Sequence, residues 1–373
     1  MLNFNKNKLF IYQTIAFAMV FLYPYLLIFI LNISIICNIF IIMENDEVIV
    51  YGIGNTLIDI ITSVEYEDLD KLGLTKGIMQ LIDSDFRKQL IDFIKNKDKL
   101  YSCGGSCPNT IITLSMLGIN TILAGKVGRD EFGKNYHKNL KTFNTKDELI
   151  DCDSKTGSSI IFDTPDSERT MNTYLCANKE FCDEDINEES VEKASYFYFT
   201  GYMWDTDNQK KAINKALNIS KENSTKVVFD IADPFAVKRY KETFLKLIEN
   251  NVDIVFANRE EAKIMFESED PFENCLKLGK ICKTAIVKNG IKGSIISHNG
   301  QIYNIPVHGS VNPIDTTGAG DIYAAGFIYG LCRNLSIREC GKIASIMAGE
   351  IISQIGAQFS NKNLLKALNL INY

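Results

Sequence analysis

Apolar runs and amphipathic stretches alternate along the chain from about residue 48. Val48–Gly54 is almost continuously apolar, which is typical of a parallel strand buried on both faces. Similar runs predict strands at Thr121–Gly125, Ser195–Thr200, Val227–Ala232, Ile254–Ala257, Thr284–Lys288 and Gly293–Ser297. Helical spacing predicts helices at Thr110–Leu117, Asn208–Lys221, Phe235–Asn250, Arg259–Glu267 and Leu335–Ile355. The alternation predicts an α/β fold with a central, mostly parallel sheet and helices on both faces.

Two regions depart from this rhythm because apolar and polar residues alternate within them. Asp59–Leu81 and Gly157–Cys176 are rich in Thr, Ile and Tyr, and we expect them to form antiparallel strands with one face in solvent. Residues 141–155 and 178–192 are polar or acidic, and we expect surface connections there.

The first 42 residues differ from the rest of the chain. No charged residue occurs from Leu9 to Met43, a length that could span a bilayer. The segment is also rich in residues with AT-rich codons, as translated upstream DNA would be. Two interpretations remain open: a membrane anchor or targeting segment, or a start at Met43 and a cytoplasmic protein. Any peptide from residues 1–42 in mass spectra of the native protein would contradict the second.

Composition narrows the class of partner. The hydrophobic content of 46% supports a large core, and the formal charge of −6 without a basic run argues against nucleic acid. Ten cysteines and three histidines show no zinc-binding spacing. Scattered cysteines suit a reducing compartment.

The most informative segment is Asp315–Asp321, with the sequence DTTGAGD. It lies between a predicted strand, residues 301–307, and an apolar predicted helix, Ile322–Cys332. Glycines allow the backbone to approach a ligand, and free N–H groups at a helix start bind anions. Asp321 could cap this helix, or it could act as a base beside an anion site.

Other polar turns follow predicted strands or precede predicted helices. The turn Gly52–Asp59 lacks a dinucleotide-binding fingerprint, because Leu57 replaces the third glycine. Taken alone, Ser102–Asn109 can be a loop with Asn109 as a helix cap, and Glu168–Thr170 can be a hairpin tip. Likewise, Asn258–Glu261 can be a helix start and Val287–Gly293 a hairpin turn.

Together, in this order, these motifs resemble those of the PfkB/ribokinase family of sugar and nucleoside kinases. The resemblance covers residues 43–373 and implies a ribokinase-like fold with a small antiparallel β lid formed by residues 59–81 and 157–176. It implies transfer of the γ-phosphoryl group of ATP to a primary hydroxyl. Asp321 would be the general base, and Gly318, Ala319 and Gly320 would hold the developing charge with their N–H groups.

The resemblance also implies the binding residues. Those for the acceptor would be Asn55, Asp59, Gly104, Gly105, Asn109 and, in the lid, Arg169. Those for ATP would be Asn258, Lys288, Gly290, Gly293 and Thr317, with Glu261 holding Mg²⁺ through water. Activation by a monovalent cation remains open.

The acceptor is less clearly indicated. Lys76–Met79, Asp233–Phe235 and residues 348–357 look most like the adenosine-kinase-like branch, which favours a purine nucleoside over ribose or fructose. Tyr174, Trp204 or Phe235 could form a wall for the base. A catalytically silent, membrane-tethered nucleotide-binding regulator and a dinucleotide-binding protein are the alternatives from other classes. We expect a monomer or a homodimer.

Overall fold

The computed structural model describes residues 48–166, 168–309 and 313–371. The hypotheses on residues 1–42 and on a start at Met43 therefore lie outside the described residues. Within the described ranges, no helix is both long and apolar enough to cross a bilayer. The described residues from Ile49 onward belong to one compact unit.

The central sheet has nine strands in the order β14-β13-β12-β11-β10-β9-β1-β5-β6. All neighbours from β12 to β6 pair in parallel, and only β12–β13 and β13–β14 are antiparallel. The mostly parallel sheet is thus confirmed. Its strands are β1 (Ile49–Ile53), β5 (Asn120–Gly128), β6 (Lys146–Cys152), β9 (Tyr196–Thr200), β10 (Lys226–Asp230), β11 (Ile254–Asn258), β12 (Thr284–Lys288), β13 (Ser294–His298) and β14 (Gln301–Ile305).

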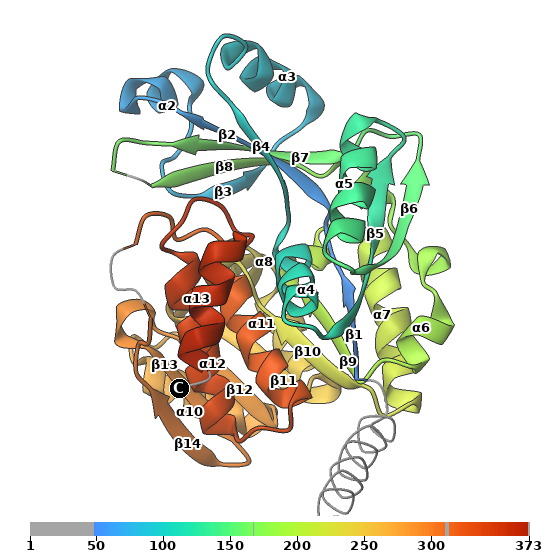
Figure 1. Ribbon diagram of the computed structural model, residues 1–373, viewed down its shortest axis with the longest axis vertical. Coiled ribbons are helices and arrows are strands. Elements are labelled where there is room, and N and C mark those ends of the chain that lie inside the picture. Colours follow the sequence, from blue (N-terminus) through green and yellow to red (C-terminus); the bar gives the residue numbers. More distant parts are fainter. Residues whose placement is uncertain (1–47, 167, 310–312, 372–373) are drawn as a thin grey trace, which may run out of the picture. The chain divides into compact units, whose positions relative to one another are not determined.

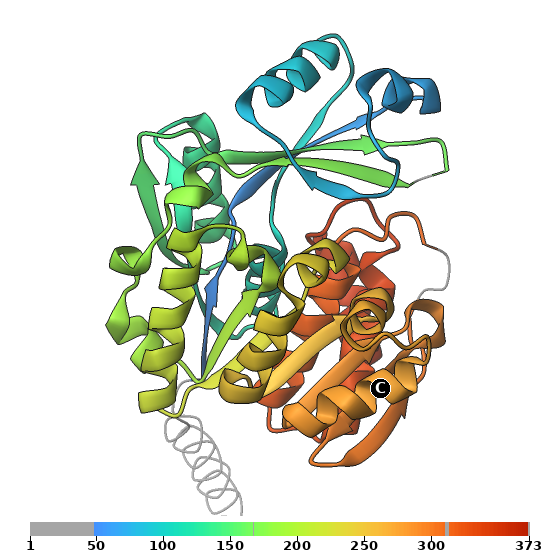
Figure 2. The same cartoon turned by 180° about the vertical axis from the view of Figure 1, so that it is seen from behind.

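Helices cover both faces of this sheet (Figures 1 and 2). One face carries α4 (Ser106–Met116), α11 (Ala319–Cys332), α12 (Ile337–Ile351) and α13 (Asn361–Ile371). The other carries α7 (Asp207–Glu222), α8 (Pro234–Asn251), α9 (Arg259–Phe266) and α10 (Pro271–Ile281), whose apolar residues join one buried hydrophobic cluster. The helices α5 (Glu131–Thr142) and α6 (Glu188–Glu192) lie toward the β6 edge.

A second sheet forms the lid, in the order β3-β8-β7-β2-β4. It consists of β2 (Leu57–Ser63), β3 (Met79–Leu81), β4 (Leu100–Gly104), β7 (Gly157–Asp163) and β8 (Arg169–Tyr174). In Figure 1, α2 (Tyr66–Leu72) and α3 (Ser84–Phe93) cover the side away from the central sheet. The pairs β2–β4 and β7–β8 are antiparallel, whereas β2–β7 and β3–β8 are parallel, so the expectation of a purely antiparallel lid holds only in part.

The structure corrects three local predictions. Residues 141–155 are not only a connection, because they contain β6, a half-exposed edge strand whose polar residues hide the strand pattern. Residues 178–192 contain α6 and short 3-10 turns. Asn109 is not a helix cap: α4 begins after Gly105, whose φ of 106° a residue with a side chain rarely adopts, and Asn109 lies inside its first turns.

Candidate active site

Asp321 lies in the first turn of α11, and its carboxylate is held by α4 rather than capping its own helix. Ser106 Oγ donates to Asp321 Oδ1 at 2.6 Å, and Asn109 Nδ2 donates to Asp321 Oδ2 at 3.0 Å. Gly318 is the residue before the helix, and no side chain caps it. Of the two sequence interpretations, the geometry therefore favours a positioned base over a cap.

Burial raises the pKa of Asp321 to about 6. The hydrogen bonds from Ser106 and Asn109 oppose this rise, the nearby Asp230 carboxylate adds to it, and Lys288 lowers the pKa. A carboxyl group with this pKa is mostly ionised at neutral pH, yet it is more basic than an ordinary aspartate. These are the properties that a general base requires.

The backbone before Asp321 presents N–H groups at a helix start. Gly318 has a φ of 74°, and a Cβ there would lie 2.4 Å from the Cβ of Ala357. The N–H of Gly320, in the first turn of α11, has no acceptor further back in the helix, whereas the N–H of Ala319 donates to the carbonyl of Thr316 at 3.2 Å. The N–H of Thr317 instead donates to Asp315 Oδ1 at 2.9 Å. This turn can hold an anion beside the Asp321 carboxylate.

Asp59 of the lid strand β2 faces the same site. A Cβ on Gly104 would lie 2.1 Å from Asp59 Oδ2, so only glycine leaves room for this carboxylate. Burial raises the pKa of Asp59 to about 7, Arg169 opposes the rise, and the charge of Asp321 adds to it. A Cβ on Gly105 would similarly meet the carbonyl oxygen of Asn55 at 2.1 Å. The four segments containing these residues therefore converge on one site.

The two predicted amide ligands have different surroundings. The side chain of Asn55 is engaged by the protein, since its Oδ1 accepts from Gln209 Nε2 at 2.7 Å and its Nδ2 contacts the carbonyl of Tyr202 at 3.4 Å. Asn109 is buried, and its Oδ1 has no hydrogen-bond partner among the described residues. Direct contact of either residue with an acceptor molecule stays a prediction.

Arg169, at the start of β8, connects the lid to the glycine turn. Its Nη2 lies 2.7 Å from Asp315 Oδ2, and both side chains are at least nine-tenths buried. Asp315 also accepts from the N–H of Thr317 and, at 2.7 Å, from the N–H of Gly356. The Nη1 group of Arg169 is buried without a hydrogen-bond partner among the described residues. The guanidinium thus lies next to the turn that would hold phosphate.

Lys288 lies beneath the glycine turn, at the carboxyl end of β12. Its Nζ is 2.8 Å from Asp230 Oδ2 and would be 3.1 Å from a Cβ on Gly320. Burial alone would lower the pKa of Lys288, but Asp230 and Glu261 raise it. The adjacent strands β10, β11 and β12 place Asp230, Asn258 and Lys288 at one edge of the sheet. In open α/β sheets, ligands bind at the carboxyl ends of the strands.

Asn258 and Glu261 form a capping box at the start of α9. Asn258 Oδ1 accepts from the Glu261 N–H at 2.9 Å, and Glu261 Oε2 accepts from the Asn258 N–H at 2.7 Å. Burial raises the pKa of Glu261 to about 8, against the lowering effect of Lys288. Asp230 and Asp233 lie close enough to Glu261 to raise its pKa further.

The carboxylate groups near Glu261 can be compared with the ligands that Mg²⁺ requires. The described part of the chain has no cluster of three or more His, Cys, Asp or Glu side chains that could enclose a metal. However, Asp233 Oδ2 is buried there without a hydrogen-bond partner among the described residues. Mg²⁺ keeps several waters and needs only one or two carboxylates beside substrate phosphates. The residues present therefore fit an ion held through water by Glu261 and its neighbours.

Other predicted residues lie in less distinctive places. Gly290 and Gly293 belong to the turn between β12 and β13, and a Cβ on Gly293 would overlap the carbonyl of Ile305. Their contact with a nucleotide stays a prediction. Trp204 packs on Phe244 in the core, with ring centroids 6.1 Å apart, and so offers no wall for a base.

Sequence reasoning missed several residues of the site. Ser106 and Thr110 lie on the same side of α4 as the predicted Asn109, and the hydroxyl of Thr110 donates to the carbonyl of Asp321 at 3.1 Å. Their i, i+3, i+4 spacing is the available signal. Asp230 was expected only as part of a strand, and Asp315 only as the start of the glycine-rich motif.

Known proteins are similar to this chain in sequence and architecture. Residues 78–364 match the pfkB family carbohydrate kinase domain. The crystal structure of adenosine kinase from Sinorhizobium meliloti is 34% identical, with a TM-score of 0.81, covering 87% of this chain and 99% of that one. An uncharacterized sugar kinase of Archaeoglobus fulgidus is 30% identical over 66% of this chain and 96% of its own length. Adenosine kinase 2 of Arabidopsis thaliana is 24% identical over 86% of this chain and 98% of its own length.

The fold and this match define the class of protein: a ribokinase-like phosphotransferase with an alcohol group as acceptor. The chain belongs to the pfkB family of carbohydrate kinases and is adenosine-kinase-like. Kinases of this family use ATP, generally with Mg²⁺, and phosphorylate small molecules such as nucleosides or sugars. The expected fold and family are thereby confirmed.

Proposed function

We propose that this protein phosphorylates the primary hydroxyl of a purine nucleoside, with ATP as donor. The similarity to an adenosine kinase over nearly the whole of that chain supports the choice of acceptor. The observation that carries the proposal is the position of Asp321, hydrogen-bonded to Ser106 and Asn109 and close enough to Asp59 to raise the pKa of that carboxyl group.

In the proposed reaction, each of these groups would have a separate role. Asp59 would accept hydrogen bonds from two neighbouring sugar hydroxyls, which orients the primary hydroxyl toward Asp321. Asp321 would take the proton of that hydroxyl as its oxygen bonds to the γ-phosphorus, and the bond between that phosphorus and the bridging oxygen to the β-phosphate would break. The N–H groups after Gly318 and the Lys288 ammonium would stabilise the charge in transfer. Bound Mg²⁺ would neutralise charge on the phosphates.

A substrate panel tests the proposal. ATP consumption would be measured with adenosine, inosine, ribose and fructose, and with an Asp321→Asn variant as the blank. We expect kcat/KM to be highest for adenosine. A higher value for ribose or fructose would contradict the nucleoside assignment, and no consumption with any acceptor would contradict the kinase mechanism.

A sugar kinase is the second candidate. One observation favours it: the 30% identity with an uncharacterized sugar kinase of Archaeoglobus fulgidus. A silent nucleotide-binding regulator is disfavoured by the intact Asp321. A thermal shift with ATP but not with NAD would separate the kinase from a dinucleotide-binding protein.

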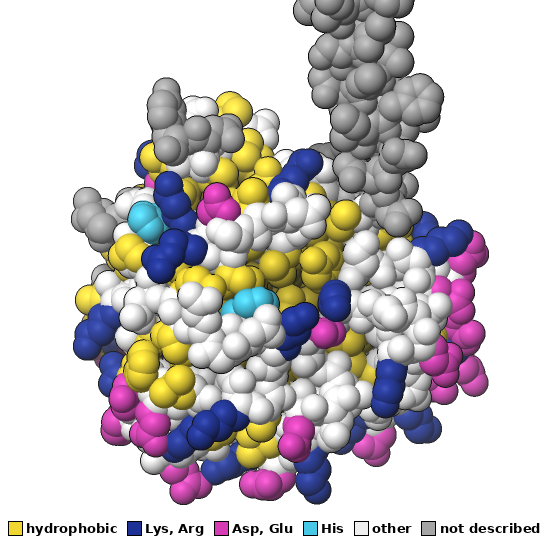
Figure 3. Space-filling model, turned by 90° about the horizontal axis from the view of Figure 1, so that it is seen from below, with side chains coloured by type: hydrophobic (Ala, Val, Ile, Leu, Met, Phe, Trp, Pro, Cys, Tyr) yellow, Lys and Arg dark blue, Asp and Glu magenta, His cyan; other side chains and the backbone are white. Residues whose placement is uncertain are grey.

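The remaining expectations concern cations and partners. On the face shown in Figure 3, Lys and Arg side chains are interspersed with Asp and Glu, as suits a protein that binds small molecules. Monovalent-cation activation would appear as an increase in kcat when K⁺ replaces a bulky organic cation. Size-exclusion chromatography with light scattering would decide between a monomer and a homodimer.

Gly104→Ala is expected to weaken acceptor binding selectively. The new Cβ would lie 2.1 Å from Asp59 Oδ2 and would displace this carboxylate from its position. We expect the acceptor KM to rise by about tenfold or more, which corresponds to about 1.4 kcal/mol, while the KM for ATP changes little. Gly73→Ala is the control for a general loss of stability, because its φ of 66° strains an alanine while the new Cβ meets nothing within 4 Å. Equal effects on both substrates would contradict the assigned position of Asp59.

Arg169→Ala is expected to reduce kcat more than it raises either KM. It removes the guanidinium beside the glycine turn and leaves the buried Asp315 with only backbone donors. We expect kcat to fall roughly 10- to 100-fold, the range of one charge-assisted contact. Arg129→Ala, which breaks an exposed ion pair with Asp153, is the control. An unchanged kcat would show that Arg169 is only a structural link.

A further inference from the structure

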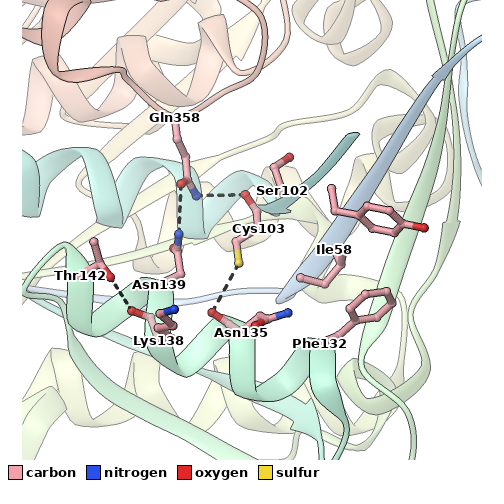
Figure 4. A pocket seen from close by; sticks show the side chains of 10 residues that line it. Ile58, Ser102, Cys103, Phe132, Asn135, Lys138, Asn139, Thr142 and Gln358 are labelled. Carbon is pink, nitrogen blue, oxygen red and sulfur yellow. Dashed lines mark hydrogen bonds between the residues drawn. The ribbon is translucent and has the colours of Figure 1, made fainter. Parts of the chain in front are cut away.

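A cavity of ≈ 660 Å³ lies behind the edge of the lid, between β4, α5 and the loop that contains Gln358 (Figure 4). Ile58 and Cys103 are register partners on β2 and β4, and both line the cavity. Because neighbouring residues of a strand point to opposite faces, Asp59 faces the active site while Ile58 faces this cavity. The two sites therefore lie on opposite faces of the same strand pair.

The lining combines an aromatic corner with side-chain amides. The rings of Tyr101 and Phe132 are 6.0 Å apart, and Tyr101 is half-exposed. Asn135, Asn139 and Gln358 supply amides, and Asn139 Oδ1 is buried without a hydrogen-bond partner among the described residues. An aromatic corner beside the unpaired amide oxygen of Asn139 suits a flat heteroaromatic ring that carries an N–H donor.

The charge of the cavity indicates an anion. Lys138 lines it, and this side chain has no ion-pair partner among the residues that the structure describes. None of the described residues that line the cavity is acidic. The volume lies within the roughly 300–1,000 Å³ typical of small-molecule sites. Lys138 is exposed, so a single unpaired cation in the lining is accessible to one phosphate group on the ligand.

The cavity borders two segments that position residues of the active site: strand β4 and the loop that contains Gly356 and Gln358. Gln358 Nε2 donates to the carbonyl of Cys103 at 3.0 Å, and Asn139 Nδ2 donates to Gln358 Oε1 at 3.4 Å. The residue after Cys103 is Gly104, which makes room for Asp59. Two residues before Gln358, the N–H of Gly356 donates to Asp315, the ion-pair partner of Arg169. A ligand here would contact the lid edge and the C-terminal loop at the same time.

We propose that this cavity is a second, regulatory site for a nucleoside monophosphate. The base would lie against Tyr101 and Phe132, with its N–H groups directed to the amides, and the phosphate would pair with Lys138. By holding β4 to the Gln358 loop, the ligand would restrain the lid and lower the rate of turnover. Binding at the cavity stands on its own geometry, and only the effect on turnover rests on the proposed kinase function.

The test uses AMP as the probe and the full chain. AMP would be titrated by calorimetry with adenosine present at saturation, and the bound region would be located by hydrogen–deuterium exchange of residues 131–142. The variant is Lys138→Met. The matched control is Lys141→Met, which removes the same charge from the same helix outside the cavity. Phe132→Leu, which removes a ring, is an independent second variant.

We expect AMP to slow exchange in residues 131–142, and Lys138→Met to weaken this binding by about tenfold, the effect of losing one charge-assisted contact. Lys141→Met should change the affinity by less than about twofold. AMP that adenosine displaces completely, or that Lys138→Met binds unchanged, would overturn the proposal. Because the exchange measurement requires no turnover, it remains informative if adenosine proves not to be a substrate.

Discussion

Replacing Asp321 with Asn is expected to remove nearly all turnover while the protein still folds. The amide cannot take the proton of the acceptor hydroxyl, and loss of a general base typically costs about 10²- to 10⁴-fold in rate. The new amide can donate to Asn109 Oδ1, which has no partner among the described residues, so the contact between α4 and α11 survives. Steady-state kinetics with circular dichroism would check both statements. An active Asp321→Asn protein would remove Asp321 from its assigned role.

The same group predicts a pH dependence. Since the pKa of Asp321 is raised to about 6 and that of Asp59 to about 7, kcat/KM should rise with pH through this range and level off above about 7. A carboxyl group whose pKa is raised in the folded state destabilises the fold once pH exceeds its ordinary value of 3.8. Asp321→Asn should therefore melt at the same temperature or higher at pH 8, and this advantage should vanish below pH 4.

Lys288→Met is expected to have the second largest effect, on both stability and rate. The substitution leaves Asp230 and the buried Glu261 without their cation, and breaking a buried ion pair typically costs about 3–5 kcal/mol. It also removes the positive charge beneath Gly320, so we expect kcat to fall at least about tenfold. Thermal denaturation and kinetics at saturating ATP would measure the two losses.

A double variant separates the ion pair from the catalytic charge. Asp230→Asn with Lys288→Met removes both partners, so stability should recover in part while turnover stays low. Lys292→Met, in the exposed turn that follows β12, is the control and should be close to neutral. If the double variant were no more stable than Lys288→Met alone, Asp230 would not be the partner that matters.

The sequence was sufficient to predict the central strands and the helices between them. Strands buried on both faces, such as β1 and β11, are continuous apolar runs, and the helices between them keep regular spacing. Asp321, Asp59 and the paired glycines could be assigned from their motifs because each needs a particular residue type at a particular place. The structure brings these separate segments to one site.

The sequence was insufficient where tertiary contacts decide the structure. The edge strand β6 is mostly polar because only part of it is covered, and residues 64–78 contain α2, although a strand was expected there. Ser106 carries no signal of its own, since a serine between Gly105 and Cys107 is an ordinary loop residue until Asp321 is folded against it. The Arg169–Asp315 pair joins residues 146 positions apart in the chain, which no local pattern can indicate.

The order of the lid strands has a consequence for how the chain assembles during synthesis. Leu57 of β2 pairs with Gly157 of β7, and β3 pairs with β8, so each parallel contact joins segments about one hundred residues apart. Contacts of such long range form slowly, because the intervening loop must close first. The lid therefore cannot be completed until residue 174 has left the ribosome, and the edge of β2 that pairs with β7 stays open after its other edge can pair with β4.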